Sequence, residues 1–282
     1  MSFNLEVTEA QAWIPEVKVL RKLKGGGQKV AFVAERASET FALKIYDPAR
    51  IDERVYREAH AMLTINSPYI IKLAEFHYKA TPQKVFVYLL EEYIDGSDLA
   101  DVLTKGKIFT AAETVKFLDQ LLQGLEATWA NHIVHRDIKP GNIMVKKNGD
   151  AVLIDFGIAR HLELETITYG LPYLGPCTPK YAPPEMLELN RKDEIDIKSD
   201  LFSLGITAYE MLTGKHPLWK RGVADDANII NMINGNAIPP TQVRTNIPKS
   251  LSDYVMKLLN KERYMRPIDA SDALQRLRKL SL

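Results

Sequence analysis

The chain has almost no cysteine, and this excludes several kinds of protein. Cys177 is the one cysteine among 282 residues, so neither an intramolecular disulfide nor a zinc site of several cysteines can form. Residues 1–15 lack the basic start and apolar centre of a signal peptide, and no apolar run approaches the roughly 18 residues of a membrane span. These absences predict a cytoplasmic protein without a membrane segment.

An excess of either charge is also missing. Lys and Arg number 37 and Asp and Glu number 36, which leaves a net charge of +1. Such a balance argues against general binding to nucleic acid or to anionic membranes. The composition, with 46% apolar and 26% charged residues, is ordinary for a globular chain. The length of 282 residues exceeds that of one usual hydrophobic core, so we expect two lobes.

The first part of the chain has the pattern of an antiparallel sheet, because short apolar stretches alternate with turn residues. Between residues 47 and 63 the pattern changes. Asp47-Pro48 has the form of a helix N-cap followed by proline, and apolar residues then recur at helical spacing. We therefore predict a sheet with one helix, which carries Glu58. The expected strands are 17–20, 30–34, 41–46, 70–78 and 84–90.

After residue 96 the pattern becomes helical. Thr110 and Glu113 form a capping box, which predicts the start of a long amphipathic helix. Further helical patterns run from Asp200 toward the end of the chain. The apolar stripe expected to be buried on the long helix is Val115, Leu118, Leu122, Leu125 and Trp129.

The most informative residues lie between these helices, in residues 135–142 and shortly after them. Asp137 is suited to accept or orient the proton of a substrate hydroxyl, and Lys139 to neutralise charge on a transferred phosphoryl group. Asn142 and Asp155 offer the hard oxygen ligands that Mg²⁺ prefers. This set predicts an ATP-dependent phosphotransferase.

A hairpin is expected to bring the two metal ligands together. Asn148-Gly149 lies between the apolar stretches 143–145 and 151–154, which is a strong hairpin signal. Asn142 and Asp155 would then lie at neighbouring ends of paired strands, close enough to share a metal ion.

Residues 135–142 and Asp155-Phe156-Gly157 resemble the catalytic loop and the magnesium loop of the eukaryotic-type serine/threonine protein kinases. Weaker matches extend the resemblance over nearly the whole chain. It implies an α+β, two-lobed protein kinase fold, with ATP bound in the cleft between the lobes. The boundaries would be an N-terminal extension (1–16), a small lobe with an antiparallel sheet and one helix (17–93), and a mostly helical large lobe (94–282).

The resemblance also implies a set of nucleotide-binding residues. Lys44 would bind the α- and β-phosphates and pair with Glu58. A glycine loop would cover the phosphates, although three glycines in a hairpin are more often just a turn and a glycine at the family's sixth position is missing. The implied nucleotide-binding residues are Gly25, Gly26, Gly27, Ala42, Lys44, Glu92, Tyr93, Asp98 and Met144.

One residue departs from the family pattern. Glu91 falls at the gatekeeper position, where the family usually has an apolar or small side chain. A carboxylate at the back of the nucleotide pocket is unfavourable unless it is paired, and Lys44 is the conceivable partner. The alternative is that the alignment with the family slips by one residue here.

Further matches concern the substrate-docking loop, residues 178–185. Thr178 is expected to form a hydrogen bond near Asp137, and Glu185 to form an ion pair with Arg266. Asp200 resembles the helix acid that supports the backbone of the catalytic loop. Lys139 and Thr178-Pro179 favour serine or threonine as the phosphate acceptor.

The resemblance therefore implies transfer of the γ-phosphoryl group of ATP to serine or threonine of a protein substrate, with Mg²⁺ or Mn²⁺ required. Arg136 could bind a phosphate added to the activation loop, and a second copy of the chain in a transient homodimer could add it in trans. The hydroxyls available there are Thr166, Thr168, Tyr169 and Tyr173. An ordinary solvated loop is the alternative for that segment.

Two other functions are kept as alternatives. A pseudokinase would keep the fold as a binding module, which the irregular glycine loop and Glu91 favour. A small-molecule kinase shares the two-lobed plan, but such enzymes usually lack both the Asp-Phe-Gly form and the docking loop.

Overall fold

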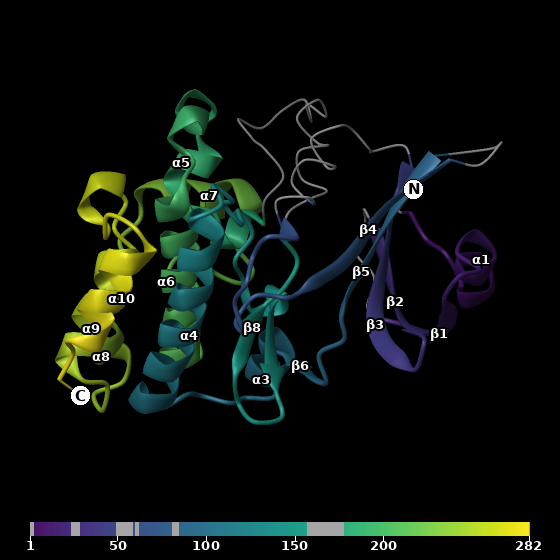
Figure 1. Cartoon of the computed structure of the whole chain (residues 1–282). Coiled ribbons are helices and arrows are strands. Elements are labelled where there is room, and N and C mark those ends of the chain that lie inside the picture. The colour runs from purple at the N-terminus through teal and green to yellow at the C-terminus, as the bar shows by residue number, and fades with distance from the viewer. Residues whose placement is uncertain are drawn as a thin grey trace. The chain divides into compact units, whose positions relative to one another are not determined.

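The computed structural model describes residues 3–23, 29–48, 59, 62–80, 85–156 and 178–281. The chain divides into two compact units (Figure 1). Of the described residues, the first unit contains 3–66 and 71–95, and the second contains 67–70, 96–156 and 178–281. Several predicted features lie outside the described residues: the three glycines 25–27, Glu58 with most of its predicted helix, and the hydroxyls of the activation loop.

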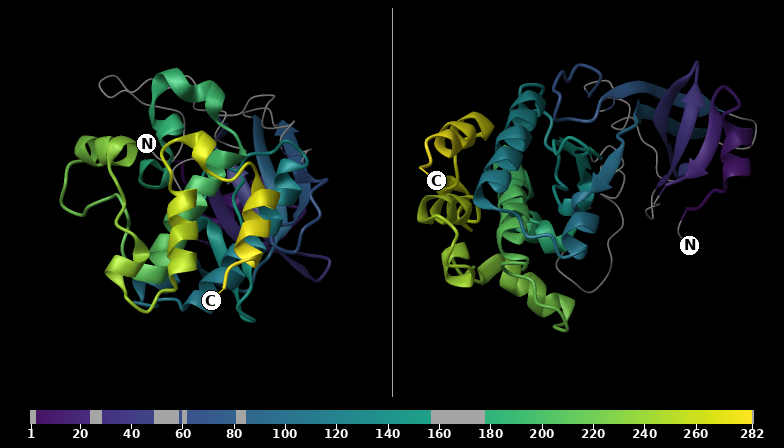
Figure 2. Two further views of the ribbon diagram at one scale, coloured as in Figure 1. Left: turned by 90° about the vertical axis from the view of Figure 1, so that its left-hand side faces the viewer. Right: turned by 90° about the horizontal axis from the view of Figure 1, so that it is seen from below.

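The first unit is built on an antiparallel sheet of five strands in the order β1-β2-β3-β5-β4. Figure 2 shows this sheet as purple and blue arrows. The strands are β1 Lys18–Lys22, β2 Lys29–Arg36, β3 Glu39–Tyr46, β4 Leu73–Ala80 and β5 Val85–Glu92. All the predicted strands are confirmed, with ends shifted by a few residues. One face of β3 and β5 belongs to the apolar core, since Phe41, Leu43, Ile45, Phe86, Tyr88 and Leu90 are buried together there.

A short helix that the sequence analysis did not predict, α1 Val7–Trp13, completes this core. The N–H of Glu6 donates to Oε2 of Glu9 at 2.8 Å, which closes the first turn. Ala10 and Ile14 are fully buried, and the Trp13 ring lies 5.0 Å from the ring of Phe86. The residues before β1 therefore form part of the core of the first unit.

The second unit is mostly helical. Its longest buried helix, α6 Ile197–Thr213, is buried at every residue except Lys198, which is partly exposed. It contacts α4 Ala111–Trp129 and α9 Lys249–Leu258 (Figure 1). Because its residues are buried on all sides, α6 lies inside the core of the second unit. The other helices are α3 Leu99–Thr104, α5 Pro184–Leu187, α7 Asp225–Asn234, α8 Pro240–Val243 and α10 Ala270–Arg278. Short 3₁₀ turns are η2 Pro140–Asn142, η4 Pro179–Tyr181, η5 Leu189–Glu194 and η6 Arg263–Met265.

The capping box of α4 is confirmed. Thr110 Oγ1 accepts from the N–H of Glu113 at 3.2 Å, and Glu113 Oε2 accepts from the N–H of Thr110 at 2.7 Å. The predicted buried stripe was too narrow: Val115 and Trp129 are only partly buried. Because α4 contacts α6, α10 and β8, its buried face also includes Thr114, Phe117, Gln120, Leu121, Gly124 and Thr128.

A small sheet carries the predicted hairpin. It consists of β6 Gly96–Asp98, β7 Ile143–Lys146 and β8 Ala151–Leu153, all antiparallel. Gly149 adopts a φ of 79° at the turn, a conformation that glycine adopts without strain. Within the described part of the chain, no helix has the length and apolar character required to cross a membrane.

Candidate active site

The backbone of residues 135–142 is held from α6. The carboxylate of Asp200 accepts hydrogen bonds from the N–H groups of His135 and Arg136, each at 2.8 Å. Asp200 is fully buried. Burial raises the pKa of Asp200 to about 7, while the two N–H donors favour its ionised form. The predicted support of the catalytic-loop backbone by this acid is confirmed.

His135 links the same loop to the segment after β8. Its Nε2 atom lies 3.0 Å from the carbonyl oxygen of Ile154, and its Nδ1 atom accepts from the N–H of Asp137 at 3.2 Å. The ring also packs edge-on against Phe156 at 4.6 Å. The buried His135 therefore fixes the spacing between the two motifs that the sequence analysis singled out.

The carboxylate of Asp137 is the centre of the site. Its Oδ2 atom lies 2.7 Å from Nζ of Lys139 and accepts from Nδ2 of Asn142 at 2.9 Å. Its Oδ1 atom accepts from Oγ1 of Thr178 at 2.9 Å, and Lys139 Nζ also donates to that hydroxyl at 2.7 Å. The predicted hydrogen bond of Thr178 near Asp137 is confirmed. Catalytic loop and docking loop thus meet at one buried carboxylate.

Two residues of this region have a left-handed backbone although neither is glycine. Arg136 has a φ of 66° and Asp155 a φ of 70°. Such conformations are unfavourable for residues with a Cβ atom and persist only where the surrounding contacts enforce them. For Arg136 the enforcing contact is the hydrogen bond from its N–H to Asp200. Each of the two predicted functional loops therefore contains one residue with this unfavourable backbone conformation.

The hairpin of β7 and β8 places the predicted metal ligands as expected. Ile143 pairs with Leu153, and the N–H of Ile154 donates to the carbonyl oxygen of Asn142 at 2.9 Å. Asn142 and Asp155 thus lie at neighbouring ends of paired strands. An amide oxygen and a carboxylate fit Mg²⁺, which binds few protein groups and retains water and phosphate ligands. A cluster of three or more His, Cys, Asp or Glu able to hold a metal does not occur among the described residues.

In the first unit, Lys44 of β3 forms a buried ion pair with Glu91 of β5. Their Nζ and Oε2 atoms are 2.7 Å apart, and the two residues are 6% and 3% exposed. The conceivable pairing of Glu91 with Lys44 is confirmed.

Of the other predicted nucleotide-binding residues, the structure describes three in the first unit, and they lie at or next to the end of the β3–β5 ladder: Ala42, Glu92 and Tyr93. Ala42 is partly buried and pairs with Glu91 in the register. The N–H of Glu92 donates to the carbonyl oxygen of Lys72 at 2.9 Å, and the Tyr93 hydroxyl accepts from Arg21 at 3.0 Å.

In the second unit, Met144 and Asp98 are paired across β6 and β7. Oδ1 of Asp98 accepts from the N–H of Asp101 at 2.7 Å, so its side chain caps α3. The sequence analysis predicted Asp98 as a nucleotide-binding residue and did not predict this cap.

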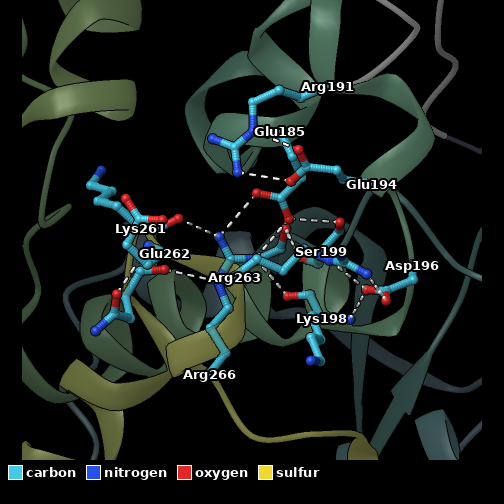
Figure 3. A network of polar contacts seen from close by, with 12 residues as sticks. Glu185, Arg191, Glu194, Asp196, Lys198, Ser199, Lys261, Glu262, Arg263 and Arg266 are labelled. Carbon is cyan, nitrogen blue, oxygen red and sulfur yellow. Dashed lines mark hydrogen bonds and ion pairs between the residues drawn. The ribbon is translucent and has the colours of Figure 1, made fainter.

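The docking loop is anchored by an ion pair without solvent exposure. Nη1 and Nη2 of Arg266 donate to the two carboxylate oxygens of Glu185 at 2.7 and 3.0 Å, and Ser199 Oγ donates to Oε1 at 2.8 Å (Figure 3). Nε of Arg266 donates to the carbonyl oxygen of Asn260, and Nη1 also to that of Lys198. The predicted pair is confirmed, and every polar atom of the guanidinium is occupied.

Sequence reasoning missed the ion pairs around this anchor. Arg191 binds Glu188 at 2.9 Å. Arg191 also binds Glu194 at 2.9 Å, and Arg263 binds Asp196 (Figure 3). The Arg191 pairs could have been found in the sequence, because three-residue spacing brings side chains together along a helical turn. The pair between Arg263 and Asp196 joins distant segments, so no sequence pattern indicates it.

A partly buried histidine that was also missed orders the docking loop. His216 Nε2 lies 2.7 Å from the carbonyl oxygen of Lys180, and its Nδ1 atom accepts from the N–H groups of Leu218 and Trp219. Burial, and then the charge of Lys180, lower the pKa of His216 to about 3. The imidazole is therefore neutral, with one nitrogen donating and the other accepting.

Comparison with known proteins identifies this arrangement. Residues 19–276 match the protein kinase domain family. A probable serine/threonine-protein kinase PknB of Bifidobacterium longum is 31% identical over 261 residues, which cover 88% of this chain and 37% of that protein. PrkC of Bacillus subtilis is 30% identical over 264 residues, covering 90% of this chain and 39% of that protein. PknB of Mycolicibacterium smegmatis is 30% identical over 210 residues, covering 74% and 32%.

The chain belongs to the protein kinase domain family. This confirms the resemblance and the fold class predicted from the sequence. The chain spans only 32% to 39% of the length of these three relatives, each of which is named a serine/threonine-protein kinase.

Proposed function

We propose that this chain is the catalytic domain of an ATP-dependent serine/threonine protein kinase. The observation that carries the proposal is the Asp137 carboxylate held between Lys139, Asn142 and Thr178. A carboxylate fixed in this way can orient the hydroxyl of the acceptor and take its proton. Lys139 supplies positive charge beside this carboxylate. That charge would stabilise the negative charge that develops on the transferred phosphoryl group.

The cofactors of the proposed reaction are ATP and Mg²⁺ or Mn²⁺. Asn142 and Asp155 would hold the metal, and Lys44 would bind the nucleotide phosphates. When bound, the metal neutralises phosphate charge. Contacts of ATP with Gly25, Gly26, Gly27, Ala42, Glu92, Tyr93, Asp98 and Met144 remain predictions, as does the pairing of Lys44 with Glu58.

The proposed acceptor is a serine or threonine of a protein. Lys139 and Thr178 support this choice, because together they line the catalytic acid at the docking loop. The anchored docking loop also favours a protein substrate over a small molecule. A pseudokinase is disfavoured, because Lys44, Asp137, Asn142 and Asp155 are all retained. Within the cell, we keep the cytoplasmic location as a prediction.

Phosphorylation of the activation loop is part of the proposal. Arg136 Nε is buried and has no hydrogen-bond partner among the described residues. A buried donor without a partner is unfavourable, and a phosphate oxygen would satisfy it. The phosphate would be added by a second copy of the chain in a transient homodimer.

The test is transfer from labelled ATP with Mg²⁺ to the chain itself and to a generic basic protein. We expect label on serine or threonine, and its loss in Asp137→Ala and in Lys44→Ala, whereas Asp253→Ala on the exposed side of α9 keeps it. The intact mass of the chain after the reaction reports added phosphate. ATP binding without any transfer, or full transfer by Asp137→Ala, would overturn the proposal.

A further inference from the structure

We propose that Glu91 is a positioning residue that holds Lys44 for the nucleotide, so that the sheet itself orients this lysine. The inference rests on the proposed function, because it assigns what fixes the phosphate-binding lysine of that reaction. At the position of Glu91, protein kinases usually have an apolar or small side chain. The ion pair with Lys44 explains why a carboxylate can occupy this position here.

The register of the sheet determines the contact. Ala42 pairs with Glu91 and Lys44 pairs with Leu89. Residues two apart on a strand point to the same face, so Lys44 and Glu91 are diagonal neighbours on one face, within reach of long side chains. The register cannot slip by one residue without moving the buried Leu43 and Leu90 out of the apolar core.

Burial makes the two charges dependent on one another. An ionised carboxylate or ammonium group away from water is strongly unfavourable unless an opposite charge contacts it. Glu91 and Lys44 are both buried and 2.7 Å apart, the distance of a charge-assisted hydrogen bond. The Lys44 ammonium is therefore held at one place on the sheet before a nucleotide binds.

The pair with Glu91 is compatible with a second acceptor at Lys44. An ammonium group has three N–H donors, and Oε2 of Glu91 is one of its acceptors. Orientation of a binding group in advance of the reaction lowers the barrier, because its freedom has already been lost. Glu58 is the second carboxylate that the resemblance implies for Lys44. The pair within the sheet adds an anchor supplied by neighbouring strands.

The first test is the kinetics of Glu91→Gln, which keeps the size and removes the charge. We expect kcat/KM for ATP to fall by about tenfold to a hundredfold, because a small displacement of a positioned group such as the Lys44 ammonium reduces the rate by this much. KM for the protein acceptor should remain unchanged, and Glu91→Asp should recover part of the loss. Glu75→Gln is the matched control, because Glu75 lies on β4 of the same sheet and pairs with Arg36 at 2.8 Å.

The second test uses no activity. Thermal unfolding is compared for Lys44→Met, Glu91→Met and the double variant, and we expect the double variant to be more stable than the sum of the single effects. Additive effects, or full kcat/KM in Glu91→Gln beside an inactive Lys44→Met, would overturn the inference alone. Undiminished transfer by Lys44→Met would instead overturn the proposed role of the lysine, while the unfolding experiment would still report the pair.

Discussion

At the scale of single residues, the Asp137 carboxylate is held in one orientation by several partners at once. Its two oxygens have three partners: Lys139 and Asn142 contact Oδ2, and Thr178 contacts Oδ1. Because the partners come from both the catalytic loop and the docking loop, the carboxylate has little freedom to rotate. A group fixed in this way acts from one orientation.

The His216 side chain makes the fold sensitive to acid. The pKa of His216 is lowered from 6.5 to about 3 by burial, so the folded chain keeps it neutral where the unfolded chain takes up a proton. Its contribution to the free energy of unfolding is therefore complete above pH 6.5 and is lost as the pH falls toward 3. We expect denaturant unfolding between these values to show a smaller loss of stability with acid in His216→Gln than in the natural chain. An unchanged slope would contradict this.

At the scale of one element, the docking loop contains the helix α5, which has only four residues. The buried ion pair between Glu185 of this helix and Arg266 anchors the loop. Removing one partner of a buried pair leaves an uncompensated charge, which costs about 3–5 kcal/mol. We expect Arg266→Met to lower the free energy of unfolding by that amount in denaturant titrations. Asp253→Asn breaks an exposed pair with Lys249 and should change it by no more than about 1 kcal/mol. Equal effects of the two variants would contradict the prediction.

Most elements could be predicted from local patterns, because alternation, helical spacing and capping boxes depend on neighbouring residues. The five strands and the start of α4 followed in this way. The helix α1 was missed because it is only seven residues long and its first turn is closed by Glu6 and Glu9 without a serine or threonine cap. The buried face of α4 was drawn too narrow, because three elements pack against that helix.

The candidate site could be predicted where residue types define the chemistry. Asp137, Thr178, Glu185 and Asp200 form the contacts expected of them. The contacts of His216 could not be predicted, because they depend on how distant segments meet in the fold. The pairing of Glu91 with Lys44 depends on the register of β3 and β5, which the sequence alone does not determine.

At the scale of the whole molecule, binding of nucleotide and metal should stabilise the folded chain. A ligand at a hundred times its dissociation constant adds about 2.7 kcal/mol. We expect ATP with Mg²⁺ to raise the Tm by about 5–10 °C, and excess chelator to remove the part that depends on the metal. Asp155→Asn should lack that part while Asp253→Asn keeps it. An increase that chelator leaves unchanged would argue against a metal held by Asn142 and Asp155.

The helix before the first strand affects how this domain can be divided. The family match begins at residue 19, after α1 has already supplied Ala10 and Ile14 to the core. A fragment cut at that boundary would expose the apolar face of β3 and β5 that α1 completes, including Phe86 beneath Trp13. Exposed apolar patches of this kind promote aggregation. The smallest piece that can keep an intact small unit therefore begins near Phe3, before the start of the family match at residue 19.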